Sequence, residues 1–182
     1  IMDKIIGFPN TSNQCYINST LQFVLHTPSL LKVITDSAAQ PSRPLLALLK
    51  QVAANYQNKQ RKSLGQLHRF VGERNEQFAN DDQQDAHEFL TTLFSLLNDE
   101  IRTFRYQEIN LDNLTAPQAF FRFTKLNGEI ESSLLLNQIQ FVVMQQFRCK
   151  KCRQTSFGFQ QEQNLVLEVE NKFGSLQLPD LM

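Results

Sequence analysis

The order in which helix-type and strand-type patterns follow one another constrains the fold of this chain most. Up to about residue 110, apolar residues recur at helical spacing. Helices are predicted over Cys15 to His26, Pro44 to Tyr56, Leu64 to Val71 and Gln83 to Asn98. Beyond residue 115, alternating apolar residues predict strands. These strands are Ala119 to Thr124, Glu129 to Leu136, Ile139 to Arg148, Thr155 to Gln160 and Asn164 to Val169. Helices followed by strands indicate an α+β fold, which we divide into a helical part, residues 1–112, and a β-rich part, residues 113–182.

Length and composition are typical of an intracellular globular protein. The chain has 182 residues, of which 41% are hydrophobic, and no net charge. It is long enough to bury one sizeable core or two small ones, and its charge favours neither a nucleic-acid partner nor a membrane partner. Three cysteines, no secretory signal and no apolar run of membrane-spanning length indicate a reducing compartment, cytoplasmic or nuclear.

The segment from Gly7 to Gln22 places a cysteine at the start of a predicted helix. At that position the helix dipole favours the thiolate of Cys15 over the thiol, but a neighbouring histidine is normally needed to complete the activation. Asn10, five residues upstream, is placed to donate an amide N–H to an oxyanion, which is worth about 2.7–4 kcal/mol in a well-formed site. The alternative is that Cys15 is a small buried hydrophobic residue.

A second segment, Asp81 to Leu97, predicts an amphipathic helix. Its apolar face consists of Ala86, Phe89, Leu90, Leu93, Phe94 and Leu97. Asp81 or Asp82 is the predicted N-cap. Asp85 and Glu88 share the opposite face, and taken alone such a pair is typical of a solvated helix surface.

Together these two segments resemble the ubiquitin-specific proteases. The first matches the family's cysteine box at Gly7, Asn10, Asn13, Cys15, Tyr16, Asn18, Ser19, Leu21 and Gln22. It departs from the box at Phe8, Ser12, Gln14 and Ile17. The second matches the family's Q-Q-D-A-x-E-F-L box over residues 83–90. Two such boxes in this order are a specific signal.

The resemblance implies a papain-like cysteine protease fold with a helical thumb followed by antiparallel β fingers and palm, present here as a partial domain. It implies hydrolysis of the peptide or isopeptide bond after the C-terminal glycine of ubiquitin, with Cys15 as nucleophile and Asn10 at the oxyanion. Carboxylates of the second box would then face the arginine-containing tail of ubiquitin. The implied substrate-binding residues are Asp85, Glu88, Gln83 and Gln84. The expected partners are ubiquitin or ubiquitinated proteins, and catalysis needs no cofactor.

A Cys-x-x-Cys motif, Cys149 to Cys152, lies between two strand-like runs. This pattern predicts a knuckle that presents two thiolates to one tetrahedral metal ion. One such pair is half of a four-ligand site, and a metal-free surface pair is the alternative. In the resembled family the first zinc knuckle of the fingers lies here, so the resemblance implies half of a structural zinc site.

The chain contains three histidines, His26, His68 and His87. His26 is expected to have a structural role and His68 to face solvent, and none lies in the Gly-His-Tyr type context of the family's catalytic base. The resemblance therefore implies that the base lies outside this chain, in a missing C-terminal half or a complementary chain, and that the chain alone is inactive. The alternatives are a non-catalytic ubiquitin-binding or scaffold module, or a half-domain completed by another polypeptide.

Overall fold

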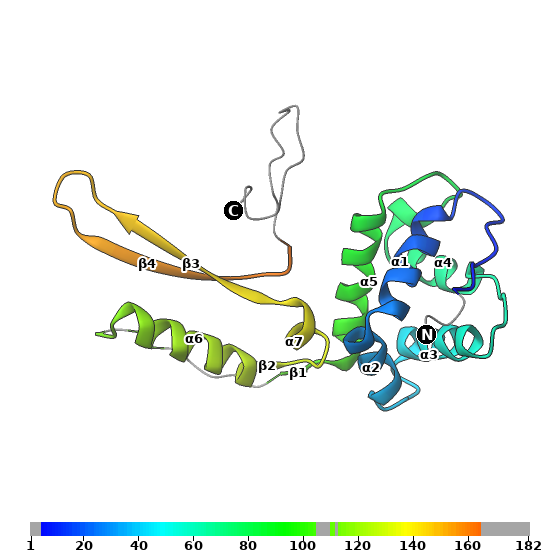
Figure 1. The fold of residues 1–182 in the computed structure, drawn as a ribbon, viewed down its shortest axis with the longest axis horizontal. Coiled ribbons are helices and arrows are strands. Elements are labelled where there is room, and N and C mark those ends of the chain that lie inside the picture. Colours follow the sequence, from blue (N-terminus) through cyan, green and yellow to red (C-terminus); the bar gives the residue numbers. More distant parts are fainter. Residues whose placement is uncertain (1–4, 105–109, 112, 165–182) are drawn as a thin grey trace. The chain divides into compact units, whose positions relative to one another are not determined.

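The computed structural model describes residues 5–104, 110–111 and 113–164, and these fall into two compact units (Figure 1). The first unit comprises residues within Ile1–Tyr106 and Gly128–Gln138, and the second comprises residues within Gln107–Asn127 and Ile139–Met182. The strand predicted over Asn164 to Val169 lies almost entirely outside the described residues. We retain the division into residues 1–112 and 113–182 as a proposal.

The first unit is mainly helical. Its elements are α1 (Cys15–His26), α2 (Pro28–Asp36), α3 (Pro44–Gln57), α4 (Gly65–Gly72), the 3-10 turn η1 (Glu76–Phe78), α5 (Ala86–Ile101) and the antiparallel strands β1 (Thr103–Phe104) and β2 (Glu131–Ser132). Helix α7 (Leu136–Ile139) follows β2. The helices predicted at α1, α3, α4 and α5 are confirmed. Helix α2 was not predicted. Proline is typical of a helix end, but Pro28 also occupies the first turn of a new helix.

The core of this unit lies between α1, α3 and α5. The apolar stripes are buried for the most part, as the helical spacing predicts, but in the predicted face of α5 Ala86 is exposed and Leu90 is half-buried. The large side chains that are fully buried include Ile17, Leu21, Leu45, Leu46, Leu49, Phe89 and Leu93. At one end of the core, Tyr16 lies 5.3 Å from Phe89 and 6.0 Å from Phe78, between ring centroids, and Phe78 lies 5.3 Å from Phe89. This aromatic cluster joins the residue after Cys15 to α5.

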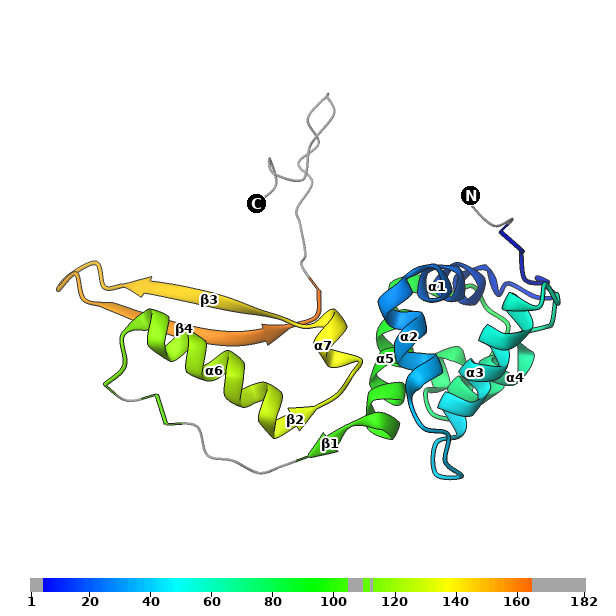
Figure 2. The ribbon, with the colours of Figure 1, turned by 60° about the horizontal axis from the view of Figure 1, so that its bottom comes forward.

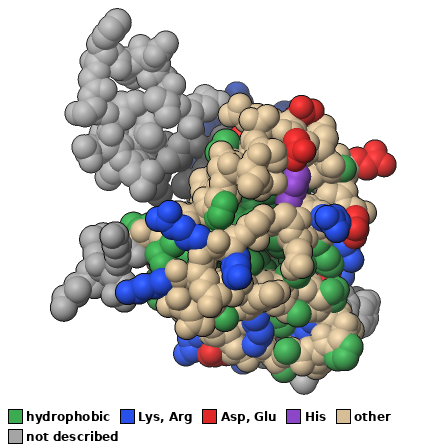
Figure 3. Space-filling model, turned by 90° about the vertical axis from the view of Figure 1, so that its right-hand side faces the viewer, with side chains coloured by type: hydrophobic (Ala, Val, Ile, Leu, Met, Phe, Trp, Pro, Cys, Tyr) green, Lys and Arg blue, Asp and Glu red, His purple; other side chains and the backbone are tan. Residues whose placement is uncertain are grey.

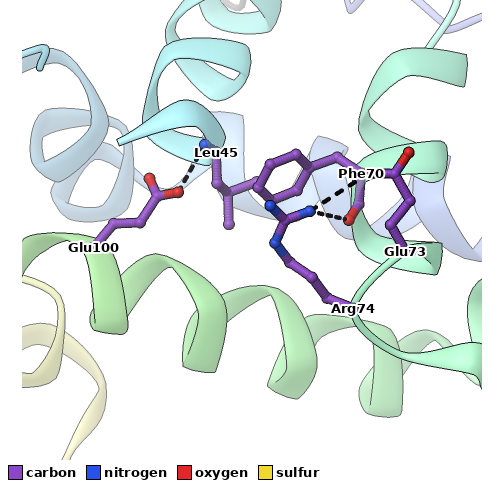
Figure 4. Close-up of polar contacts among 5 residues, drawn as sticks. All are labelled: Leu45, Phe70, Glu73, Arg74 and Glu100. Carbon is purple, nitrogen blue, oxygen red and sulfur yellow. Dashed lines mark hydrogen bonds and ion pairs between the residues drawn. The ribbon is translucent and has the colours of Figure 1, made fainter. Parts of the chain in front are cut away.

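Helix α3 is capped from another helix rather than from its own sequence. The residue preceding it, Arg43, makes no side-chain cap. Instead, the two carboxylate oxygens of Glu100 on α5 accept hydrogen bonds from the backbone N–H groups of Leu45 and Leu46, each at 2.9 Å, and Figure 4 shows the bond to Leu45. A carboxylate at this position also favours the helix dipole. The same figure shows Arg74 stacked 3.4 Å over the ring of Phe70.

Gly72, the last residue of α4, is packed too closely for any side chain. A Cβ atom there would lie 2.8 Å from both the Cα of Ala79 and the carbonyl oxygen of Phe78. We expect Gly72→Ala to lower the free energy of unfolding by about 1–3 kcal/mol, because backbone cannot yield as a flexible side chain does. Urea unfolding measures this, with Gly65→Ala as the control. At Gly65 the nearest atom, Ser63 Oγ, is 3.4 Å away, so alanine should be neutral or stabilising. Equal effects of the two changes would contradict the prediction.

The second unit consists of a helix and a β-hairpin. Strand β3 (Phe141–Arg148) pairs antiparallel with β4 (Thr155–Glu162), with Arg148 opposite Thr155, which confirms the two strands predicted here. Helix α6 (Ala116–Ile130) packs against the hairpin, since the rings of Phe120 and Phe123 lie 5.9 Å and 5.7 Å from that of Phe159.

Two predicted strands of the β-rich part are wrong. Residues 119–124 lie within α6, and residues 129–136 contain the end of α6, β2 and the start of α7. The phenylalanines of the first segment resemble a strand pattern, yet Phe120 and Phe123 are spaced for one helix face. The missed signal is a capping box. The side-chain oxygen of Gln118 accepts a hydrogen bond from the backbone N–H of Thr115 at 3.0 Å, directly before α6 begins.

Candidate active site

Cys15 is the first residue of α1, and its side chain is exposed. The loop before it turns through a hydrogen bond from the backbone N–H of Gln14 to Oδ1 of Asn10, at 3.0 Å. The first intrahelical bond then runs from Asn18 N–H to the carbonyl oxygen of Gln14, also at 3.0 Å. Cys15 is therefore not the buried hydrophobic residue that the alternative predicted. It presents its sulfur at the positive end of the α1 dipole.

The amide of Asn10 has a fixed polarity in this loop. Its oxygen accepts the N–H of Gln14, so its Nδ2 hydrogens form the opposite end of the group, and the residue is exposed. An amide oriented in this way has its donor end free to bond to an incoming oxygen. The oxyanion role predicted for Asn10 stays a prediction.

The two sequence boxes are held together by direct hydrogen bonds. Ser12 Oγ donates to Oδ1 of Asp81 at 2.8 Å, and Asn13 Nδ2 donates to the carbonyl oxygen of Asp81 at 3.0 Å. Farther along α1, Thr20 Oγ1 donates to the carbonyl oxygen of Ala86 at 3.2 Å. Helices α1 and α5 accordingly lie side by side in both views (Figures 1 and 2). The loop that carries Cys15 is thus fastened to the loop that precedes α5.

The buried side-chain amide of Gln14 supports the same loop. Gln14 is 5% exposed, and its Nε2 lies 3.3 Å from Ser12 Oγ and 3.3 Å from Nδ1 of His68 on α4. His68 is half-buried, so the prediction that it faces solvent is wrong. Ser12 and Gln14 are two of the four departures from the family's cysteine box. In this chain they connect the loop to α4 through His68 and to the α5 side through Asp81.

Burial raises the pKa of the Tyr16 phenol, and the nearby charges of Asp81 and Cys15 raise the pKa further. The phenol therefore stays neutral around pH 7. A neutral ring suits its position in the aromatic cluster with Phe78 and Phe89.

Asp85 is the N-cap of α5, so the prediction of Asp81 or Asp82 as N-cap is wrong. Its Oδ1 accepts the backbone N–H groups of His87 at 2.7 Å and Glu88 at 3.0 Å. The other two carboxylates are engaged in the preceding loop, where Asp81 accepts from Ser12 and Asp82 accepts from Asn80. Side-chain partners in that loop, which the sequence pattern does not reveal, moved the helix start downstream.

The other predicted tail-binding residues lie around this helix end. Glu88 accepts a hydrogen bond from Nε2 of Gln77 in η1. The same nitrogen lies 3.5 Å from Oε1 of Gln84. Gln83, Asp85 and Glu88 are exposed, and Gln84 is half-buried. The structure therefore presents carboxylates to solvent at the amino end of α5, on the element that packs beside the cysteine helix.

Capping makes α5 sensitive to acid. The backbone N–H groups of Glu88 and His87 hold the pKa of Asp85 below its ordinary value. The resulting stabilisation is present above the unfolded-state pKa of about 3.9 and is lost as pH falls through the lower folded-state pKa. We expect Asp85→Asn, which keeps a capping oxygen but cannot titrate, to reduce the loss of stability below about pH 4. Urea unfolding between pH 7 and pH 2 measures this, with Asp82→Asn as control. An identical loss of stability at acid pH for the wild type and Asp85→Asn would contradict the prediction.

The Cys-x-x-Cys motif forms the turn between β3 and β4, and both thiols are exposed. The turn is closed by hydrogen bonds from Cys149 N–H to the carbonyl oxygen of Gln154, at 2.8 Å, and from Arg153 N–H to that of Cys149, at 3.0 Å. Backbone N–H groups of Cys152 and Lys151, with the Cys152 side chain, lower the pKa of the Cys149 thiol. Donors that stabilise a thiolate in a tight turn fit a metal knuckle. Over the described ranges, no group of three or more Cys, His, Asp or Glu is placed to hold a metal ion.

Two histidines, His26 and His68, contact other groups of the helical unit in a way that indicates a structural role. His26 Nδ1 lies 2.7 Å from the carbonyl oxygen of Gln22, and its Nε2 lies 3.2 Å from the hydroxyl of Tyr56. His68 contacts Gln14, as above. His87 is exposed in the first turn of α5.

Among the described helices, none is both long and apolar enough to cross a bilayer.

Comparison with known proteins gives one consistent result. The family described as ubiquitin carboxyl-terminal hydrolase matches residues 6–181. Ubiquitin carboxyl-terminal hydrolase 36 of Drosophila simulans is 29% identical over 90% of this chain and 16% of its own length. Ubiquitin carboxyl-terminal hydrolase 12 of Salmo salar is 27% identical over 93% of this chain and 47% of its own length. The chain thus spans less than half of either relative.

A solved structure shares the fold. The structure of the SAGA Ubp8/Sgf11/Sus1/Sgf73 DUB module bound to ubiquitin aldehyde matches all of this chain with a TM-score of 0.66 and 15% sequence identity. The match covers 39% of that chain. The predicted fold class, a partial papain-like α+β domain, is confirmed.

Proposed function

The chain belongs to the ubiquitin carboxyl-terminal hydrolase family, and from that membership we propose that it carries the nucleophile of a thiol-dependent deubiquitinase. One observation supports the proposal above all: an exposed thiol, Cys15, begins a helix next to a loop that is anchored to Asp81, just before the second family box. In the proposed reaction, sulfur attacks the carbonyl carbon of the C-terminal glycine of ubiquitin. The C–N bond breaks, a thioester forms, and water then hydrolyses the thioester.

Each proposed residue makes a separate contribution. Cys15 supplies the attacking sulfur from an exposed position at the amino end of α1. Asn10, held by its own oxygen, donates its N–H to the oxyanion and contributes about 2.7–4 kcal/mol. A base must move the proton from sulfur to the leaving amine. We place that base outside this chain. His26 and His68 are engaged with Gln22, Tyr56 and Gln14, and His87 does not lie in the Gly-His-Tyr type context of the family's base.

We propose that the carboxylates at the start of α5 bind the arginine-containing tail of ubiquitin. Glu88 is the better test residue, because Asp85 also caps the helix. We expect Glu88→Gln to weaken ubiquitin binding by roughly tenfold at low salt and less at high salt, since charge-assisted bonds of exposed groups are screened by ions. Fluorescence anisotropy of labelled ubiquitin with the complete protein measures this. Glu76→Gln in η1 is the matched control, and an unchanged affinity of Glu88→Gln at low salt would refute the assignment.

The hairpin knuckle is proposed to hold half of a structural zinc site. Cys149 and Cys152 supply two thiolates, and the knuckle N–H groups already favour the thiolate of Cys149. The two remaining ligands would come from a segment outside the described residues. Zinc bound in this way would fasten the hairpin to another segment and contribute to folding rather than to catalysis.

The alternative is a non-catalytic ubiquitin-binding module, or a half-domain that another polypeptide completes. The structural bonds of His26 and His68 favour one of these for the chain taken alone. The deciding experiment uses ubiquitin with a C-terminal fluorogenic amide. We expect the complete protein to hydrolyse this substrate in a buffer that is as reducing as the cytoplasm or nucleus. We expect the 182-residue chain alone to bind the substrate without hydrolysing it. Binding without hydrolysis by the complete protein would favour the non-catalytic module.

A further inference from the structure

Residues 37–72 contain no acidic residue. The same segment carries six cations, which are Arg43, Lys50, Lys59, Arg61, Lys62 and Arg69, although the whole chain has no net charge. It forms α3, the connection that follows and α4. The acidic residues of the first unit therefore lie elsewhere, mainly in the segment from Glu73 to Glu100. A continuous stretch of one sign favours a positive potential around this segment.

A groove opens on the same segment. It has a volume of about 490 Å³, which is within the usual range of about 300–1,000 Å³ for binding pockets. Its apolar floor comes from Phe8, Leu48, Val52, Leu64 and Leu67, and its cationic lining comes from Lys62 and Arg69. Uncharged polar side chains, among them Gln51 and Gln66, complete the lining. Figure 3 shows this side of the molecule, where hydrophobic side chains lie in a hollow surrounded by Lys and Arg side chains.

The cations of the groove are not neutralised within the described residues. The ion pairs of the described residues join Arg74 to Glu73 and Arg102 to Asp99, and none of these four residues lines the groove. Glu100, which reaches α3 from α5, spends both carboxylate oxygens on the backbone N–H groups of Leu45 and Leu46. The groove therefore combines an apolar floor with uncompensated positive charge.

We propose that this groove docks an acidic segment of a partner protein, which inserts one or more large apolar side chains between α3 and α4. Apolar side chains in the hollow would remove the half-buried Phe8, Leu48 and Val52 from water. Carboxylates beside them would meet Lys62 and Arg69. Such rim charges mainly raise the association rate and the specificity. A nucleic-acid backbone would use the cations but leave the apolar floor in water. None of the residues proposed to contact ubiquitin lines the groove, so this inference goes beyond the proposed function.

A random peptide library displayed on phage, selected on the full chain, tests this proposal. We expect the selected peptides to combine Glu or Asp with Phe, Leu or Ile, and synthetic versions to bind saturably. Replacing their apolar residues with serine, or their acidic residues with amides, should each weaken binding by about tenfold or more. Arg69→Glu and Lys62→Glu should each weaken it by roughly tenfold, more strongly at low salt.

Matched controls separate the groove from general charge. Lys32→Glu, an exposed change of the same size on α2 outside the groove, should alter affinity by less than about twofold. Unfolding curves of the variants establish that each one folds. Three results would each overturn the proposal. The selected peptides could lack acidic residues, or their binding could be unchanged by Arg69→Glu and Lys62→Glu. The chain could instead prefer a single-stranded DNA oligonucleotide, with binding that these variants abolish. Ubiquitin binding should be unaffected by the peptide, so loss of hydrolysis and loss of docking are distinguishable.

Discussion

Cys15→Ala should abolish the proposed hydrolysis of ubiquitin C-terminal amides by the complete protein, with an expected loss on the order of 10⁴-fold or more. The change deletes the only atom proposed to form the thioester. It should leave the fold intact, because Cys15 is exposed at the start of α1 and alanine is the best helix former. Release of a fluorophore from ubiquitin measures the loss, and far-UV circular dichroism with urea unfolding checks the fold.

Covalent labelling adds an independent readout. Ubiquitin that carries a C-terminal electrophile should attach to Cys15 of the wild-type protein, and peptide mapping distinguishes this site from the other exposed thiols, Cys149 and Cys152. Thr11→Ala, an exposed change in the same loop, is the matched control and should keep both activities. Hydrolysis by Cys15→Ala within tenfold of wild type, or labelling at another cysteine, would remove Cys15 from the mechanism.

Phe89→Ala should lower the free energy of unfolding of the first unit by about 3–5 kcal/mol. Phe89 is 0% exposed and contacts both Tyr16 and Phe78, so its removal leaves a cavity between α1, α5 and η1. Domains of this kind have total stabilities of about 5–15 kcal/mol, so the loss is a large part of the whole. Urea unfolding followed by circular dichroism measures it.

Phe23→Ala is the matched control for this truncation. Phe23 lies on α1 and is 52% exposed, so the same chemical change there should cost less than about 1 kcal/mol. Because Tyr16 follows Cys15 directly, Phe89→Ala should also slow labelling of Cys15 by loosening the helix start. The prediction would be contradicted if Phe89→Ala lowered the free energy of unfolding by less than about 1 kcal/mol, or if both variants lowered it equally. The aromatic cluster would then not be the main support of the site.

Much of the helical unit was predictable because its signals are local. The stripe of Ile17, Leu21 and Val24 predicts α1, and Pro44 at the first turn predicts the start of α3. The Cys149 and Cys152 turn between alternating runs predicts the hairpin. These features depend on residues within a few positions of one another, so a pattern in the sequence is enough to locate them.

The errors arose where two local signals competed. Around Phe120 the aromatic residues favour a strand. Gln118, which accepts the backbone N–H of Thr115 as in one half of a capping box, favours a helix. Packing of Phe120 and Phe123 on Phe159 accompanies the helix. Ahead of α5, three aspartates compete to cap the helix, and bonds from Ser12 and Asn80 engage Asp81 and Asp82, which leaves Asp85.

The sequence by itself determined the family, the fold class and the identity of the candidate nucleophile, because these depend on residue types at fixed spacing. Tertiary structure alone decided how the cysteine loop is supported. Ser12 finds Asp81, Gln14 finds His68, and Glu100 caps α3. The physical reason is that each bond joins residues more than fifty positions apart. Only packing of the apolar helix faces brings such distant groups within hydrogen-bonding distance.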